Sequence, residues 1–139
     1  MNQLEKAISI ALRVHEGQTD RYGQPYILHP LFVMLQMDSE AEMTAAVLHD
    51  VIEDSETTLA DLREEGFSDE VLEAVRLMTH EEADSYEAYV RKLKPNPMAR
   101  KIKLADLRHN MDIRRMDRVR AGDTERLERY RSAWESLTS

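Results

Sequence analysis

Apolar residues recur with the period of an α-helix along most of the chain, and this periodicity constrains the fold more than any other feature. In segment 2–15 the apolar side chains fall on one helical face, as in an amphipathic surface helix. Segment 40–52 is apolar on more than one side, which is typical of a buried helix. No run alternates between apolar and polar residues over a useful length, so a β-sheet is not expected. The sequence therefore predicts an all-α fold.

Capping residues, glycines and prolines divide this helical pattern into segments. Pro30 is expected to open a short helix that runs to about residue 37. Thr58, with Asp61 three positions later, resembles a capping box, and Gly66 is a natural helix stop. Further helices are expected at 68–78, 85–93 and 96–113, and from 123 or 124 onward. A chain of 139 residues fits one compact domain, so we expect a single helical bundle over 1–139.

Composition excludes several classes of protein. The chain has no cysteine, so disulfides and thiolate zinc sites are impossible. Its start does not resemble a signal peptide, and no apolar stretch is long enough to span a bilayer, so we expect a cytoplasmic protein without a membrane partner. The net charge of −8 argues against nucleic-acid binding.

The charge is unevenly distributed along the chain. Residues 36–90 hold 17 acidic and 2 basic side chains, whereas residues 91–131 hold 14 basic and 6 acidic ones. The basic region could face an anionic small molecule. The simpler interpretation is that its arginines only solvate helix faces and turns, namely Arg114, Arg115, Arg118 and Arg120.

Ionisable residues interrupt the apolar segment 40–52 and continue just beyond it. His49 and Asp50 stand between Val47-Leu48 and Val51-Ile52, where burial without partners would be unfavourable. Glu53 and Asp54 follow directly, and these acids would repel one another if they were all charged and unpaired. A divalent cation removes that repulsion, and an acid that does not bind the metal could orient water or move protons.

Two further elements carry similar chemistry. Asp106 lies in an apolar helical run, and Asn110 shares its helix face four positions later. Lys103 lies near that face, where it could bind phosphate oxygens or instead pair with Asp54 or Asp106. His29 stands between Pro25 and Pro30, which stiffen its loop. Histidines and carboxylates without sulfur favour Mn²⁺, Fe²⁺ or a similar divalent transition metal.

Four stretches together resemble the HD superfamily of metal-dependent phosphohydrolases: HEGQ at 15–18, GQPYILHP at 23–30, LHDVIED at 48–54 and KLADLRHNM at 103–111. The chain is most similar to the hydrolase domain of RelA/SpoT proteins and to the small alarmone hydrolases. The resemblance implies an HD-domain helical bundle with a metal site between helices. It implies a Mn²⁺ ion held by His29, His49, Asp50 and Asp106.

The same resemblance implies a reaction and roles for further residues. It implies hydrolysis of the 3′-pyrophosphate of (p)ppGpp, a small-molecule nucleotide, by water that Glu53 and Asp54 position and activate. Asn110 matches a family position near the substrate, and Arg21 matches a basic position in the nucleotide-binding loop. His15 also matches a family histidine, which we interpret as structural.

The family pattern is not matched at three positions, Asp20, Tyr22 and Ile113. Asp20 replaces a base before Arg21 and Tyr22, and Ile113 replaces a small hydroxyl residue that lines the pocket. These departures favour, as an alternative, an HD-domain hydrolase of another nucleotide, such as an adenosine 3′-pyrophosphate or a nucleoside monophosphate. A second alternative is a non-catalytic nucleotide-sensing module, but such a module would be expected to have lost a ligand or a catalytic acid. The sequence does not indicate an oligomeric state.

Overall fold

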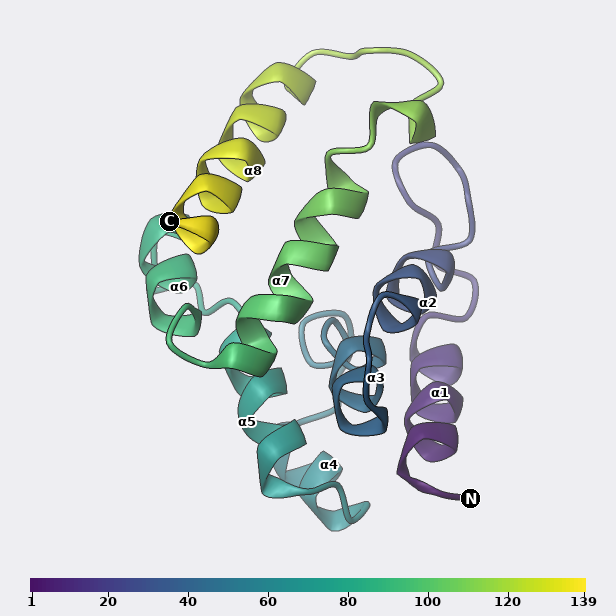
Figure 1. Cartoon of the computed structure of the whole chain (residues 1–139). Coiled ribbons are helices and arrows are strands. Elements are labelled where there is room, and N and C mark those ends of the chain that lie inside the picture. The colour runs from purple at the N-terminus through teal and green to yellow at the C-terminus, as the bar shows by residue number, and fades with distance from the viewer.

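The computed structural model describes residues 1–139 and contains helices without any β-strand, which confirms the predicted all-α class (Figure 1). No helix is long and apolar enough to cross a membrane. The elements, in chain order, are α1 (Gln3–Val14), α2 (Leu28–Leu35), α3 (Glu40–Val47), α4 (Leu59–Glu64), α5 (Asp69–Met78), α6 (Tyr86–Leu93), α7 (Pro97–Asn110), the 3₁₀ turn η1 (Ile113–Arg115) and α8 (Asp123–Thr138).

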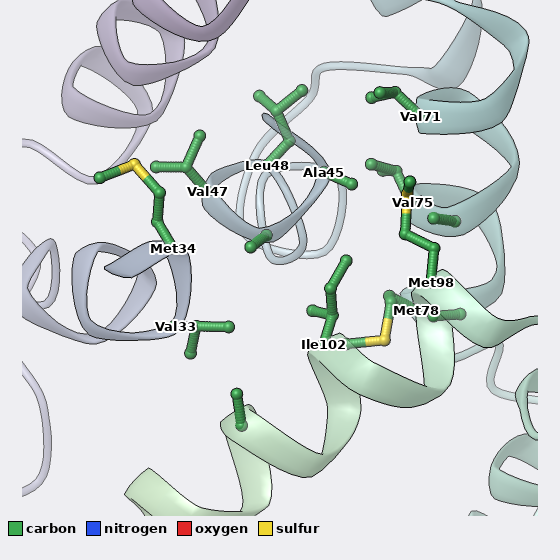
Figure 2. Close-up of a cluster of buried hydrophobic side chains, with 14 of the residues drawn as sticks. Val33, Met34, Ala45, Val47, Leu48, Val71, Val75, Met78, Met98 and Ile102 are labelled. Carbon is green, nitrogen blue, oxygen red and sulfur yellow. The ribbon is translucent and has the colours of Figure 1, made fainter. Parts of the chain in front are cut away.

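Helix α3 lies at the centre of the bundle and packs against α1, α2, α5 and α7 (Figure 1). Small residues such as Ala45 and Ala46 are fully enclosed on α3, so the surrounding helices can approach it closely. Figure 2 shows branched and methionine side chains of α2, α5 and α7, among them Val33, Val75 and Ile102, that converge on this helix. The ends of α2, α3 and α7 are thereby held in fixed relative positions, and the polar residues expected to carry chemistry lie on or next to these helices.

Local capping chemistry explains most of the helix boundaries. Ser68 accepts a hydrogen bond from Val71 N and starts α5. Thr58 and Asp61 form the reciprocal capping box of α4, and Asn96 followed by a proline starts α7. Gly122 adopts φ 89°, a left-handed conformation that side-chain-bearing residues rarely take, directly before α8. These short-range signals are visible in the sequence, and the starts predicted from them for α4, α5, α7 and α8 are confirmed.

The expected helix over 40–52 is too long. Helix α3 ends at Val47, and residues 48–54 form turns. Nδ1 of His49 lies 2.6 Å from the backbone carbonyl oxygen of Ala46. In a longer helix this oxygen would accept a backbone N–H, so the His49 ring takes the place of that hydrogen bond. His49 and Asp50 consequently project from a turn after the helix, where both can face the same point.

Two other boundaries differ from the sequence prediction. Helix α2 begins at Leu28, two residues before Pro30, because a proline in the first turn lacks only an N–H that has no helical partner there. Helix α7 ends at Asn110 instead of reaching Ile113. Asp112 then caps the separate turn η1 through a hydrogen bond from Arg114 N.

Candidate metal centre and adjoining pocket

Side chains from three parts of the chain meet where α2, α3 and α7 approach one another. Ligand atoms of His29, His49 and Asp50 all lie within 4.8 Å of one another. Asp106 joins them from α7: its Oδ1 lies 2.8 Å from Nε2 of His29 and 3.4 Å from Nε2 of His49. Nε2 of His49 is also 3.1 Å from Oδ2 of Asp50. All four residues assigned as metal ligands from the sequence are thus gathered at one point.

The hydrogen bonding of His49 suits this residue to bind a cation. Because its Nδ1 can only donate to the carbonyl oxygen of Ala46, the neutral ring keeps a lone pair on Nε2. That Nε2 is buried and has no hydrogen-bond partner, although two carboxylates face it. A buried nitrogen lone pair among carboxylate oxygens is an unfavourable arrangement that a divalent cation would satisfy. The residues present therefore fit a divalent metal site.

Lys103 contacts Asp106 and does not line the pocket described below. Its Nζ lies 2.9 Å from Oδ2 of Asp106 and about equally near the ring centroids of Tyr86 and Tyr89, at 5.5 and 5.1 Å. Burial alone would lower the pKa of Lys103, but the Asp106 carboxylate more than reverses this and holds the pKa well above its usual value. Of the two roles the sequence left open for Lys103, the structure shows the pairing with Asp106, and Lys103 does not share the pocket that Arg21 lines.

Glu53 and Asp54 lie beside the cluster without belonging to it. Glu53 Oε1 accepts a hydrogen bond from the backbone N–H of His80. Asp54 Oδ2 accepts one from Nε2 of Gln18 at 3.3 Å, and Gln18 is itself held by His15, whose Nδ1 lies 3.0 Å from Oε1 of Gln18. The HEGQ stretch thus holds Asp54 in place, which agrees with a structural role for His15.

The environment of Glu53 and Asp54 makes both more basic than ordinary carboxylates. Burial, followed by the charge of Asp50, raises the pKa of Asp54. Burial also raises the pKa of Glu53, and the hydrogen bond from His80 reverses this only in part. A carboxylate with a raised pKa accepts a proton more readily near neutral pH, as a general base must.

A pocket of about 330 Å³ adjoins the cluster at His29. It lies between the loop before α2, the end of α7 and the start of α8, and Arg21, Asn110 and Tyr26 line it. Asn110 Nδ2 also donates to Oδ1 of Asp106, at 3.2 Å, while the Tyr26 hydroxyl donates to Oδ2 of Asp50. The pocket therefore contacts two of the clustered acids through residues that can also bind a ligand. A larger hollow of about 840 Å³ between α6 and α8 shares none of these residues.

Asp20 is not a free acid in this pocket. Its Oδ1 accepts hydrogen bonds from the backbone N–H groups of Tyr22 and Gln24, at 2.9 and 3.0 Å, and so shapes the loop. Its Oδ2 lies 3.4 Å from a guanidinium nitrogen of Arg115. The carboxylate that replaces a base is thus paired within the protein, and its repulsion of a bound anion is reduced.

Several pocket residues escaped the sequence analysis. Arg115 was interpreted as solvating a turn, but it is only partly exposed and lines the pocket. Arg126 and Tyr130 reach the pocket from α8, for which the sequence suggested no site. His109 lies with its Nδ1 2.7 Å from Nδ1 of His29, and burial together with Arg115 lowers the pKa of His109 to about 4. Only the tertiary fold brings these side chains to the site.

Comparisons with known proteins agree with this geometry. The family described as HD domain matches residues 7–133. The "GTP pyrophosphokinase" of Streptomyces coelicolor is 38% identical over 125 residues, which cover 80% of this chain and 14% of that protein. The "Bifunctional (p)ppGpp synthase/hydrolase SpoT" of Escherichia coli is 35% identical over 127 residues, which cover 80% of this chain and 18% of that protein. The chain thus spans less than a fifth of the length of these relatives.

A solved structure is similar over nearly the whole chain. It is described as a metazoan ortholog of SpoT that hydrolyzes ppGpp, and it matches with a TM-score of 0.80 over 99% of this chain and 86% of that one. The two sequences are 21% identical, so this likeness concerns the fold. Because the HD-domain match covers most of the chain, including every residue of the clustered site, the chain belongs to the HD-domain family, as its sequence predicted.

Proposed function

We propose that this chain is a Mn²⁺-dependent phosphohydrolase that removes pyrophosphate from the 3′ position of (p)ppGpp-like nucleotides. The observation that carries the proposal is the cluster of two histidines and two acids that opens onto a pocket with arginine in its lining. Relatives named guanosine-3′,5′-bis(diphosphate) 3′-pyrophosphohydrolase support the choice of substrate, for example that of Haemophilus influenzae, which is 39% identical over 118 residues. A nucleotide also suits an acidic protein whose basic residues are concentrated in one region. We place the protein in the cytoplasm, where such nucleotides occur.

The proposed ligands are His29, His49, Asp50 and Asp106. When bound, the metal supplies Lewis-acid polarisation of a phosphate oxygen and lowers the pKa of water. Mn²⁺ suits this mixed nitrogen and oxygen donor set without sulfur, although other divalent transition metals share that preference.

Glu53 and Asp54 are the proposed catalytic acids. Their raised pKa values suit a group that accepts the proton of the attacking water, and each is held in place by hydrogen bonds from the protein. Glu53 would take the proton, since its only hydrogen-bond partner is a backbone N–H that leaves its second oxygen free. Asp54, which is held by Gln18, would orient the water.

Arg21 and Asn110 are the proposed substrate-binding residues. Both line the pocket next to His29, and Arg21 forms no ion pair within the protein. A guanidinium can form two hydrogen bonds to phosphate oxygens, whereas the Asn110 amide can reach a ribose or a phosphate. Lys103 would act on the substrate only indirectly, because its charge is directed to Asp106.

A second candidate function is hydrolysis of a different nucleotide, such as an adenosine 3′-pyrophosphate or a nucleoside monophosphate. The ion pair between Asp20 and Arg115 favours it, since the pair removes one of the charges that would otherwise bind phosphate. A non-catalytic sensing module is disfavoured because both catalytic acids and all four ligands are present.

One assay separates these candidates. The purified chain is incubated with Mn²⁺ and, in turn, with guanosine and adenosine 3′-pyrophosphates and with nucleoside monophosphates, and the released phosphate species is identified. Pyrophosphate release that requires Mn²⁺ and is lost in Asp106→Ala supports the proposed function. Turnover of a monophosphate alone would favour the second candidate, and no turnover of any nucleotide would favour a sensor. Arg108→Gln, an exposed change on the same helix, is the matched control.

A further inference from the structure

We infer that His109 is a positioning residue, whose Nδ1 accepts a hydrogen bond from Nδ1–H of His29 and thereby leaves the lone pair on Nε2 of His29 free to bind the metal. This inference rests on the proposed function, because it assumes that His29 is a ligand. The two Nδ1 atoms lie 2.7 Å apart, a distance that requires one proton between them. The ring planes are nearly parallel, with an angle of 12° between them, and the ring centroids are 5.0 Å apart. Two imidazoles that meet edge to edge at this N–N distance would have such a centroid separation, so each nitrogen can direct its lone pair or proton at the other.

The two proposed histidine ligands differ in how their ring proton is fixed. Nδ1 of His49 faces the carbonyl oxygen of Ala46, which can only accept, so a neutral His49 ring carries its proton on Nδ1 and its lone pair on Nε2. His29 has no such carbonyl partner. Its Nδ1 faces another imidazole, and its Nε2 faces Oδ1 of Asp106 at 2.8 Å.

Two proton arrangements satisfy both contacts of a neutral His29 ring. In the first, Nε2–H donates to Asp106 and Nδ1 accepts from His109. In the second, Nδ1–H donates to His109 and Nε2 carries the lone pair. Only the second leaves His29 able to coordinate a cation, and it requires His109 to be neutral with its own proton on Nε2.

The surroundings of His109 favour this accepting role. Its ring is stacked on Phe32, with centroids 4.0 Å apart and an angle of 14° between the planes, which fixes the direction of Nδ1. Arg115 donates to the backbone carbonyl oxygen of His109 at 2.9 Å, which holds the end of α7 beside this ring. His109 is therefore oriented by the packing of its ring and by the contact of its backbone.

Two variants separate the hydrogen bond from the packing. His109→Phe keeps an aromatic ring against Phe32 but has no acceptor, whereas His109→Asn loses the ring but places an amide oxygen near the position of Nδ1. Binding of Mn²⁺ is measured by titration calorimetry in the absence of nucleotide. We expect His109→Phe to weaken Mn²⁺ binding by about 10- to 100-fold, the usual effect of losing the partner of a metal-bound histidine. His109→Asn should restore most of the affinity, and Arg108→Gln should bind as the unaltered protein does.

A second readout observes the proton itself. In the zinc-loaded protein, which is diamagnetic, ¹⁵N chemical shifts of the rings should show the proton of His29 on Nδ1 and that of His109 on Nε2. Thermal unfolding of each variant with chelator shows whether it is folded. A folded His109→Phe variant that binds Mn²⁺ as tightly as the unaltered protein would refute the inference, as would a ring proton on Nε2 of His29 in the zinc-loaded protein.

The same titrations separate this inference from the proposed function. If His29→Ala and Asp106→Ala leave Mn²⁺ binding unchanged, the proposed metal centre itself is wrong. If both abolish binding while His109→Phe does not weaken it, the centre stands and only the role of His109 is refuted.

Discussion

Replacing Lys103 by methionine tests whether the metal centre depends on a buried counter-charge. Lys103 is 7% exposed, and its Nζ is 2.9 Å from a carboxylate oxygen of Asp106, which is itself 5% exposed. At an effective dielectric constant of about 20, two unit charges at that distance attract by about 6 kcal/mol. Desolvation of both groups offsets part of this attraction, so the pair's net contribution to stability is smaller. The variant, however, leaves the Asp106 charge buried and without its partner.

Breaking a buried ion pair in this way costs about 3–5 kcal/mol. For a chain of this length, each kcal/mol corresponds to about 3–4 °C of unfolding temperature, so Lys103→Met should unfold about 9–20 °C lower than the unaltered protein. The measurement is thermal unfolding in the presence of a chelator at neutral pH. Added Mn²⁺ should recover part of the loss, because a bound cation at the centre would replace the missing positive charge beside Asp106.

Lys101→Met is the matched control, two positions away on the same helix. Lys101 pairs with Asp38 and Glu42, but its side chain is 37% exposed, so its removal should cost no more than about 1 kcal/mol. Equal losses in the two variants would refute the argument that burial makes the Lys103 pair important. If Lys103→Met lowers the unfolding temperature by the same amount when Asp106 is already replaced by Asn, the loss comes from packing and not from the charge.

Four other variants test individual roles. Asp106→Asn should lose bound Mn²⁺ in a direct titration, and unchanged affinity would remove it from the ligand set. Glu53→Gln should keep Mn²⁺ while turnover falls about 10²- to 10⁴-fold, and parallel loss of metal would show that Glu53 is a ligand instead. Arg21→Ala should raise KM more than it lowers kcat, so a fall in kcat alone would contradict the binding role. Asp20→Asn should release Arg115 and lower KM for a nucleotide with several phosphates, whereas a higher KM would mean that the pair itself shapes the binding site.

The Glu53→Gln variant also has a pH dependence that follows from its surroundings. Burial raises the pKa of Glu53, so folding favours its protonated form. That contribution to stability is complete below the ordinary pKa of about 4.3 and is lost as the pH rises through the raised pKa. With chelator present, Glu53→Gln should therefore unfold at a higher temperature than the unaltered protein at pH 7, and the difference should shrink at acidic pH. A constant difference across that range would show that its cause is not ionisation.

The sequence predicted those features that depend on neighbouring residues. Helix starts follow from caps such as Ser68 and Asn96, whose partners lie within three positions. The residues of the candidate centre were also identifiable, because an ionisable group such as His49 in an apolar run needs a partner wherever that run folds. The end of α3 was misjudged, since the apolar pattern continues through Val51 while the backbone turns after Val47.

The supporting residues depend on contacts that local patterns do not encode. His29 and His109 are 80 positions apart, and Asp20 and Arg115 are 95 apart, so neither pairing leaves a periodic signal. Lys103 illustrates the intermediate case. Its position three residues before Asp106 suggested either an ion pair with that acid or a contact with phosphate oxygens. Only its burial against the rings of Tyr86 and Tyr89, which the fold determines, shows that it forms the ion pair.

The distribution of charge links the stability of the fold to its function. Asp50, Glu53 and Asp54 occur within one short turn, and burial, with a smaller contribution from the charge of Asp50, raises the pKa values of Glu53 and Asp54, so their ionised forms are unfavourable there. Lys103 forms its ion pair with Asp106, and its charge only partly offsets the rise in the pKa of Glu53. A bound divalent cation would offset the remaining repulsion, and a ligand at about 100 times its Kd stabilises a fold by about 2.7 kcal/mol. Glu53 and Asp54, the acids proposed to activate water, are thus groups that weaken the metal-free fold, so replacing Glu53 should raise the metal-free unfolding temperature without lowering metal affinity.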